Sequence, residues 1–107
     1  MSNEAILVLC TAPNAEEAER LAKGIVEAGL AACVNVVAGL RSFYVWDGKL
    51  QDDTEVQLLI KTREERAVEL RDWIGEHHGY DVPEILFVPI TGGSERYLAW
   101  LRERTSR

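Results

Sequence analysis

The chain has 107 residues, a formal net charge of −6 and 47% hydrophobic residues. This length and apolar content fit one globular domain over residues 1–107 and exclude a disordered chain. The acidic balance argues against nucleic acid and anionic membrane surfaces as partners, since both favour a basic surface. The N-terminal residues show neither a basic segment nor a cleavage pattern, so we expect a cytoplasmic protein with free thiols.

The first predicted elements are a strand and a helix. Residues 5–12 form a continuous apolar run, which is typical of a buried strand. Asn14 follows in a position to cap a helix, and Glu17 completes the pattern of a capping box. Gly29 is placed to end this helix as a left-handed C-terminal cap.

The middle of the chain predicts a long hairpin. Residues 30–46 and 48–62 are both rich in strand-forming side chains, and the Asp-Gly pair at 47–48 favours a type I′ turn between them. Each arm reaches about 14 residues, or roughly 45 Å, more than twice the usual strand length. The hairpin must therefore project beyond a small sheet, and we expect bends or bulges at 38–40 and 51–53.

A second helix follows the hairpin. Thr62 and Glu65 have the spacing of another capping box, so the sequence predicts that this helix starts directly after the strand. It is expected to run to about His78, with Gly79 as its stop.

The last elements complete a recognisable order. Residues 83–90 predict a fourth strand, in which Pro89 requires an edge position or a strand end. Ser94 then caps a short terminal helix. The order βαββαβ plus a C-terminal helix is the ferredoxin-like α+β arrangement, an antiparallel sheet with two helices on one face.

The other face of this sheet is too apolar for a monomer. The first strand carries Ile6 and Val8 on one face but also Leu7 and Leu9 on the other, where polar residues are expected. About eight exposed apolar side chains would forgo over ~10 kcal/mol of burial. With the aromatic segment 43–46, this predicts a closed homo-oligomer. The alternative is a hairpin that folds back on its own chain.

Strand directions gather potential metal ligands at one end of the sheet. Right-handed crossovers place Cys10 at the same end as the only two histidines, His77 and His78, and there we also expect the hairpin tip and Glu84. Cys33 starts its strand at the other end. The strand length between the two cysteines exceeds the reach of a disulfide within one chain.

The local pattern alone does not require a metal. Adjacent helical residues point about 100° apart, whereas helical zinc sites use residues four apart. The residues therefore favour a solvated helix end for the histidines, whose charge suits the helix dipole, and a core position for Cys10. If a thiolate and two imidazoles do converge, they favour copper or zinc. No nucleophile–base set is evident, so we expect a protein that is not an enzyme.

Several segments together resemble the CutA divalent-cation tolerance family. They lie in the family's order and cover the chain from about Ala5 to Leu101: "VLCTAPN", "AxxLAxxxxxxGLAACVN", "FYVWDGKLQ", "EVQLLIKT", "HHGYDVPEI" and "YLAWL". The resemblance implies a ferredoxin-like subunit in a homotrimer, as in PII-type signalling proteins. It also implies a link to tolerance of copper and other divalent metals, and no enzymatic activity.

The same resemblance implies a metal site. At the positions of the family's copper ligands this chain has Cys10, His77 and His78, which would bind Cu(II) or, less selectively, Zn(II). One departure is Gly79, which stands where proline is usual in the family and leaves the turn looser. The implied function is metal binding in cation tolerance and metal homeostasis.

A second implied site lies between subunits. Trp46, Lys61, Tyr80 and Glu84 match recurrent family positions and are assigned to an intersubunit pocket. Lys61 lies at the opposite end of its own sheet, so a shared pocket requires a neighbouring subunit. The alternative function is therefore a PII-like sensor that binds a small anionic metabolite in this cleft.

Overall fold

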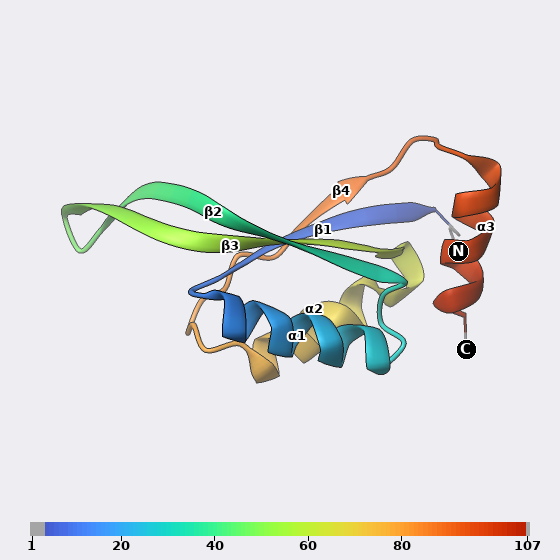
Figure 1. The fold of residues 1–107 in the computed structure, drawn as a ribbon, viewed down its shortest axis with the longest axis horizontal. Helices are drawn as coiled ribbons and strands as arrows, with labels where there is room; N and C mark the ends of the chain where they lie inside the picture. The colour runs from blue at the N-terminus through green and yellow to red at the C-terminus, as the bar shows by residue number, and fades with distance from the viewer. Residues whose placement is uncertain (1–3, 107) are drawn as a thin grey trace.

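The chain folds as a four-stranded antiparallel sheet with two helices on one face. The structure, a computed structural model, describes residues 4–106. In chain order its elements are β1 (Ala5–Ala12), α1 (Ala15–Glu27), β2 (Cys33–Trp46), β3 (Lys49–Arg63), the 3-10 turn η1 (Glu64–Arg66), α2 (Ala67–His77), β4 (Leu86–Pro89) and α3 (Glu95–Arg104). The strand order is β2-β3-β1-β4, and α1 and α2 lie side by side below the sheet (Figure 1). This confirms the predicted ferredoxin-like arrangement.

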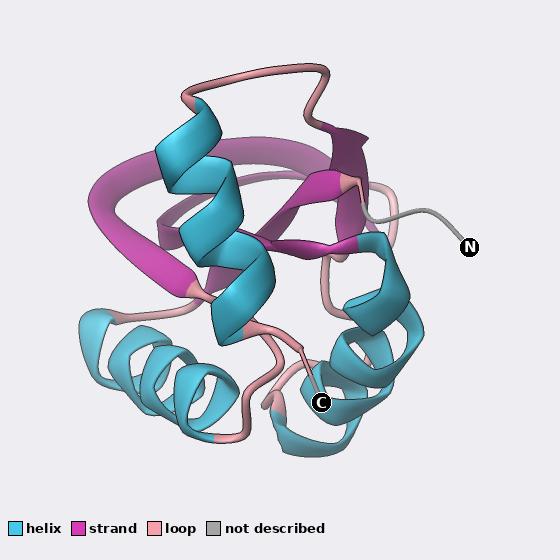
Figure 2. Ribbon diagram, turned by 90° about the vertical axis from the view of Figure 1, so that its right-hand side faces the viewer, coloured by secondary structure: helices cyan, strands magenta, loops and turns pink. Residues whose placement is uncertain are grey.

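The core lies between the sheet and these two helices. Alternate residues of the two central strands point into it, as the period of a strand requires. Figure 2 shows α1 and α2 together on this side of the sheet, with α3 crossing in front of the sheet end. The largest fully buried apolar side chains include Val8, Leu21, Ile25, Leu58, Ile60, Leu70 and Ile74.

The ends of α1 follow the sequence closely. Asn14 Oδ1 accepts a hydrogen bond from the Glu17 backbone N–H at 2.9 Å, which confirms the predicted cap. The Glu17 carboxylate pairs with Arg20 at 2.6 Å rather than returning to the Asn14 backbone. Gly29 follows the helix with a φ of 73°, the left-handed conformation expected of a terminating glycine.

The hairpin of β2 and β3 is as long as predicted. Its strands have 14 and 15 residues, and the turn residues Asp47 and Gly48 have φ values of 53° and 74°, as a type I′ turn requires. The hairpin extends well past the ends of α1 and α2 (Figure 1), and the molecule measures 45 × 24 × 24 Å.

Only one of the two expected irregularities in the hairpin is present. The register shifts between Val37 and Leu40, and Gly39 takes a φ of 86°, which confirms a bulge within 38–40. The expectation for 51–53 is wrong, because these residues pair in unbroken register with residues 42–44. Each of these residues has one partner on β2, so no extra residue is left over to form a bulge.

The predicted start of α2 is wrong. Thr62 is still part of β3, and its hydroxyl donates to the Leu30 carbonyl at 2.7 Å, so it is not free to cap a helix. The chain instead passes through η1, and α2 begins after Arg66 without a side-chain cap. A tertiary hydrogen bond has taken the side chain that the local pattern assigned to the helix.

The end of α2 lies within one residue of the expectation. His77 is the last helical residue, and His78 is already extended, with φ −78° and ψ 144°. The last helical residue therefore lies two positions before Gly79, and the two histidines have different backbone conformations.

The C-terminal part of the chain largely follows the prediction. β4 is shorter than the apolar run 83–90, but it is an edge strand and ends at Pro89, as predicted. Ser94 Oγ accepts from the Tyr97 backbone N–H at 3.3 Å and caps α3. No helix within residues 4–106 is long and apolar enough to cross a membrane.

Two arginines hold α3 across the sheet end where β1 begins and β3 finishes. Both are buried, and both donate to the Thr105 carbonyl, Arg63 at 3.0 Å and Arg66 at 2.7 Å. Arg63 also donates to the Thr105 hydroxyl at 3.0 Å. These bonds satisfy the Thr105 carbonyl at the end of the helix, where the helix itself supplies no donor.

The face of the sheet away from α1 and α2 keeps its apolar residues uncovered. Register places Leu9 opposite Leu59 and Leu86, and Leu7 opposite Val88, all on this face. Leu86 and Val88 are 54% and 38% exposed. We call these five residues the open face. Their positions confirm that both faces of the sheet are apolar.

Candidate functional site

The end of β1 and the end of α2 meet, as strand directions predicted. The imidazole Nε2 of His78 lies 2.7 Å from the Thr11 carbonyl oxygen, one residue after Cys10. The hairpin tip lies at this same end of the sheet and projects well beyond these residues (Figure 1). The sequence prediction was right for the end of the sheet on which the helix end and the tip lie, although the tip is too far out to contact these residues.

Both ring nitrogens of His78 are engaged within the fold. Nε2 donates its hydrogen to the Thr11 carbonyl, and Nδ1 accepts the Tyr80 backbone N–H at 3.0 Å. A neutral imidazole has one donor and one acceptor, so neither nitrogen has a lone pair left. The residue is 9% exposed, and its ring also packs against that of Tyr80 at a centroid distance of 4.8 Å.

His77 is arranged differently. Its Nδ1 lies 2.7 Å from the Trp73 carbonyl, to which it donates, and its ring stacks on the Trp73 indole with centroids 3.9 Å apart. The side chain is exposed, and Nε2 keeps an accessible lone pair. Arg20 donates to the His77 backbone carbonyl at 2.7 Å and so ties the end of α2 to α1.

Cys10 is a core residue in this fold. It is 1% exposed, and burial raises the pKa of its thiol to about 12, with the Glu84 and Glu55 carboxylates as smaller causes. Metals bind the thiolate, so an uncharged buried thiol is a poor ligand as it stands.

The three predicted metal ligands therefore do not form a ready-made centre in one chain. Among residues 4–106, no group of three His, Cys, Asp or Glu side chains is placed to hold a metal ion. Of the predicted ligands, only His77 offers a free donor atom. Cys10 and His78 would first have to break contacts of the fold.

A connection that the sequence did not indicate runs from His78 to the hairpin. The Tyr80 hydroxyl donates to Glu55 Oε2 at 2.8 Å, and Glu55, on β3, is 9% exposed. Burial raises the pKa of Tyr80, and the Glu55 carboxylate adds to the effect. The local sequence showed no sign that Glu55 would be buried and hydrogen-bonded, because its partner Tyr80 lies in a loop 25 residues further along the chain.

The four residues predicted to form a pocket do not all lie together in one chain. Trp46 is 65% exposed near the hairpin tip. Tyr80 contacts Glu55, where the hairpin leaves the sheet, a point we call the hairpin root. Glu84 is exposed and contributes to the raised pKa of the Cys10 thiol. Lys61 lies in the half of β3 away from the turn, paired with Cys33 at the start of β2.

Lys61 has its own polar surroundings. Its Nζ donates to the Asn35 side-chain oxygen and lies 3.9 Å from Cys33 Sγ. Burial raises the pKa of Tyr97 on α3, and interaction with Cys33 is the next cause. Three elements thus bring Lys61, Asn35, Cys33 and Tyr97 together, a group we call the Lys61 cluster. Cys10 and Cys33 are both free thiols, as expected.

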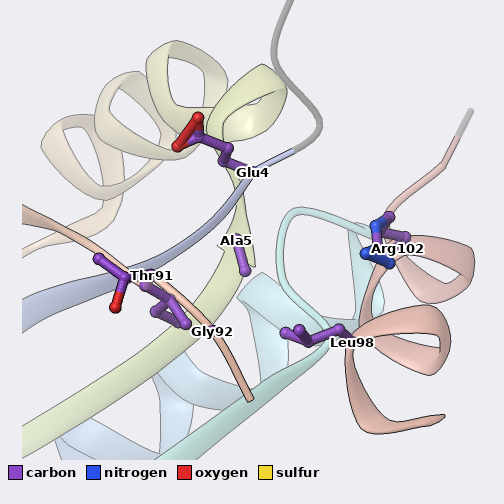
Figure 3. Close-up of a pocket in the computed structure, with 7 residues that line it drawn as sticks. Glu4, Ala5, Thr91, Gly92, Leu98 and Arg102 are labelled. Atoms are coloured by element: carbon purple, nitrogen blue, oxygen red, sulfur yellow. The ribbon is translucent and has the colours of Figure 1, made fainter. Parts of the chain in front are cut away.

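The hollows of the single chain lie elsewhere. A cavity of about 150 Å³ separates the start of β1 from α3 and is lined by residues that include Glu4, Thr91 and Arg102 (Figure 3). A more open hollow of about 330 Å³ lies between α1 and β2, beside Lys23 and Val34. Neither is lined by any of the predicted site residues.

Comparisons with known proteins place this fold and sequence in one family. The family profile described as CutA1 divalent ion tolerance protein matches residues 6–104. "Protein CutA, chloroplastic" from Arabidopsis thaliana is 49% identical over 94% of this chain, and the chain spans 55% of that relative's length. "Divalent-cation tolerance protein CutA" from Pectobacterium atrosepticum is 45% identical over 92% of this chain and 89% of that protein.

Solved structures agree with the sequence matches. The crystal structure of CutA1 from Oryza sativa superposes with a TM-score of 0.94 at 46% identity and covers 98% of both chains. A divalent cation tolerance protein from Thermus thermophilus gives a TM-score of 0.92 at 45% identity, covering 95% of this chain and 99% of its own. The chain belongs to the CutA1 divalent ion tolerance protein family.

Proposed function

We propose that this chain forms a cytoplasmic homotrimer that binds a divalent cation, Cu(II) in preference to Zn(II), and contributes to cation tolerance without enzymatic activity. The names of the family and of its bacterial relatives support a role in tolerance of divalent cations. The preference for copper and the trimer are what the resemblance to the CutA family implies, and the side chains described above support metal binding and association of chains.

The observation that carries the proposal is the free Nε2 of His77. Copper and zinc both favour imidazole nitrogen. Metal-binding histidines usually donate their other N–H to a carbonyl or carboxylate, which fixes the ring, and His77 Nδ1 already donates to the Trp73 carbonyl. Stacking on Trp73 restricts the ring further. The nitrogen is therefore presented to solvent in a fixed orientation.

The open face supports the oligomer. Half-buried Leu7, Leu9 and Leu59 adjoin exposed Leu86 and Val88, and a chain of 12.0 kDa rarely leaves such a surface in water. A closed ring of identical subunits can cover this face on every copy at once. The projecting hairpin, with exposed Phe43 and Trp46, supplies apolar surface to reach a neighbour.

Copper titration of the purified oligomer tests the metal proposal. Isothermal calorimetry should give about one weak site per chain, because His77 is the only one of the three predicted ligands that has a free nitrogen. The variant His77→Ala/His78→Ala should lose this site. Equal affinity in the variant and the wild type would remove these histidines from the proposal.

The Lys61 cluster supports a second candidate function, a sensor for a small anion in an intersubunit cleft. Lys61 Nζ, the Asn35 amide and the Tyr97 hydroxyl are hydrogen-bond donors that come together on one side of the sheet. A thermal-shift screen with nucleotides and organic acids tests this candidate. Stabilisation that disappears in Lys61→Ala would favour it, and no stabilisation by any anion would remove it.

A further inference from the structure

We infer that the two adjacent histidines have separate roles: His78 is a positioning residue that fixes the hairpin root and takes no cation, whereas His77 alone offers a nitrogen to one. The part that concerns His77 rests on the proposed function. The part that concerns His78 stands on the fold alone.

The hydrogen bonds of His78 leave no donor atom for a metal. Its partner at Nε2 is the Thr11 carbonyl, which can only accept, so this nitrogen must carry the hydrogen. Its partner at Nδ1 is the Tyr80 backbone N–H, which can only donate, so this nitrogen supplies the lone pair. Binding a cation at either nitrogen would break a hydrogen bond that the ring makes to the backbone, at a cost in stability.

The same bonds connect His78 to the hairpin. His78 holds the Tyr80 backbone, and the Tyr80 hydroxyl donates to Glu55 on β3. Glu55 pairs with Leu40, where the register shift of β2 ends. The contacts therefore run from the end of β1 through the loop after α2 to the point where the hairpin leaves the sheet. We infer that they set the angle of the hairpin root.

His77 has the opposite arrangement. Its Nδ1 faces the Trp73 carbonyl and must carry the hydrogen, so Nε2 holds the lone pair. Arg20 is close enough to bind the His77 carbonyl, but the Glu17 carboxylate lies 2.6 Å from its guanidinium and offsets the charge. The positive charge of Arg20, the α1 residue that contacts the end of α2, is therefore compensated.

The first test reads the tautomers directly and needs no metal. The two rings should show opposite tautomers, Nε2–H for His78 and Nδ1–H for His77. A long-range ¹H–¹⁵N spectrum of the full ¹⁵N-labelled chain, recorded where both rings are neutral, distinguishes these forms. The chain has only two histidines, so His77→Gln assigns both sets of signals. The same tautomer on both rings, or fast exchange at His78, would overturn the inference.

The second test adds a diamagnetic ion, Zn(II), to the same sample. The ¹⁵N shift of His77 Nε2 should move, while both His78 nitrogens and the Tyr80 amide stay unchanged. Movement of the His78 nitrogens together with His77 would contradict the separation of roles. If no signal moves, the proposed cation binding and the role given to His77 fail. The positioning role of His78 is then tested by its tautomer alone.

Single variants separate the roles in solution. His77→Ala should abolish zinc and copper binding with little change in the thermal midpoint, and His78→Ala should keep the binding stoichiometry but lower the midpoint by about 5 °C or more. If His78→Ala does not fold, His78→Gln, whose amide can still donate to the Thr11 carbonyl, replaces it. Loss of metal binding in folded His78→Gln would overturn the inference.

Discussion

The two faces of the sheet have similar strand compositions but different surroundings. On one face α1 and α2 bury Val8, Cys10 and Leu58 completely or nearly so. On the other face Leu86 and Val88, with the same kind of side chain, remain exposed to solvent. One face is covered by helices of the same chain, whereas the open face can be covered only by another chain. Apolar content along a strand therefore indicates how many faces will be covered, not which molecule covers them.

The largest expected difference between the two faces comes from placing the same charged residue on each of them. Leu58→Asp places a carboxylate in the sealed core, where an unpaired charge is not tolerated, and should unfold the chain. Leu86→Asp places the same group on the exposed side of an edge strand and should leave each chain folded. We expect it instead to dissociate the oligomer.

Circular dichroism and sedimentation velocity measure the two outcomes. The expected result for Leu86→Asp is native secondary structure in a particle of one 12.0 kDa chain. A wild-type protein that already sediments as a single chain at micromolar concentration would contradict the role given to the open face. So would an unfolded Leu86→Asp, because it would show that this side chain supports its own subunit.

The sequence predicted those features that depend on local patterns. The Asp-Gly turn, the Asn14 cap and the doubled apolar faces each follow from residues close together in the chain, and all three are present. The start of α2 was missed because Thr62 hydrogen-bonds to Leu30, which lies 32 residues away in the sequence.

The candidate site was predicted less completely than the fold. Topology brought the end of β1 to the end of α2, and the His78–Thr11 contact confirms it. The number of free nitrogens could not be predicted, because it depends on where the Thr11 carbonyl and the Tyr80 N–H point. Composition identifies potential ligands, and only the three-dimensional hydrogen bonds show whether their lone pairs are free.

Alkaline pH should lower the stability of the fold, because Cys10 is buried as a neutral thiol. The pKa of this thiol is raised from 9.0 to about 12, so above pH 9 the unfolded chain loses a proton that the folded chain keeps. Stability must then fall as pH rises from 9 towards 12, by about 2 kcal/mol near pH 10.5 and up to about 4 kcal/mol at the upper end. Below pH 9 the effect should be absent.

Urea unfolding of wild type and Cys10→Ala at about pH 8 and about pH 10.5 isolates this contribution. Ionisation of other groups, Tyr80 among them, affects both proteins and cancels in the difference. The variant should lose less stability between the two conditions than the wild type. Equal losses would show that the thiol is not protected on the covered face.

Replacing a helical glycine by alanine usually stabilises a protein, but at Gly24 in α1 we expect the opposite. A Cβ at Gly24 of α1 would lie 2.7 Å from two atoms of the Trp73 indole, which is itself stacked on His77. Gly24→Ala should therefore destabilise the fold by about 1–3 kcal/mol, although alanine is the better helix former. Gly75→Ala in α2 meets nothing within 4 Å and should stabilise it by about 0.5–1 kcal/mol. Thermal or urea unfolding of both variants gives the sign, and a stabilising Gly24→Ala would show that the indole moves freely.

The smallest expected effects compare the root of the hairpin with its outer part. Tyr80→Phe removes the hydroxyl that binds Glu55 and should cost about 1–2 kcal/mol, because a largely buried carboxylate then loses its donor. Arg41→Met breaks the 2.7 Å pair with Asp52 further out, and since both side chains are well exposed it should cost less than about 0.5 kcal/mol. Hydrogen exchange of the β3 amides gives a second measure, with faster exchange near Glu55 expected only in Tyr80→Phe. Equal losses in the two variants would mean that the hairpin root is no more firmly held than its outer part, and that the contacts through His78 do not set its angle.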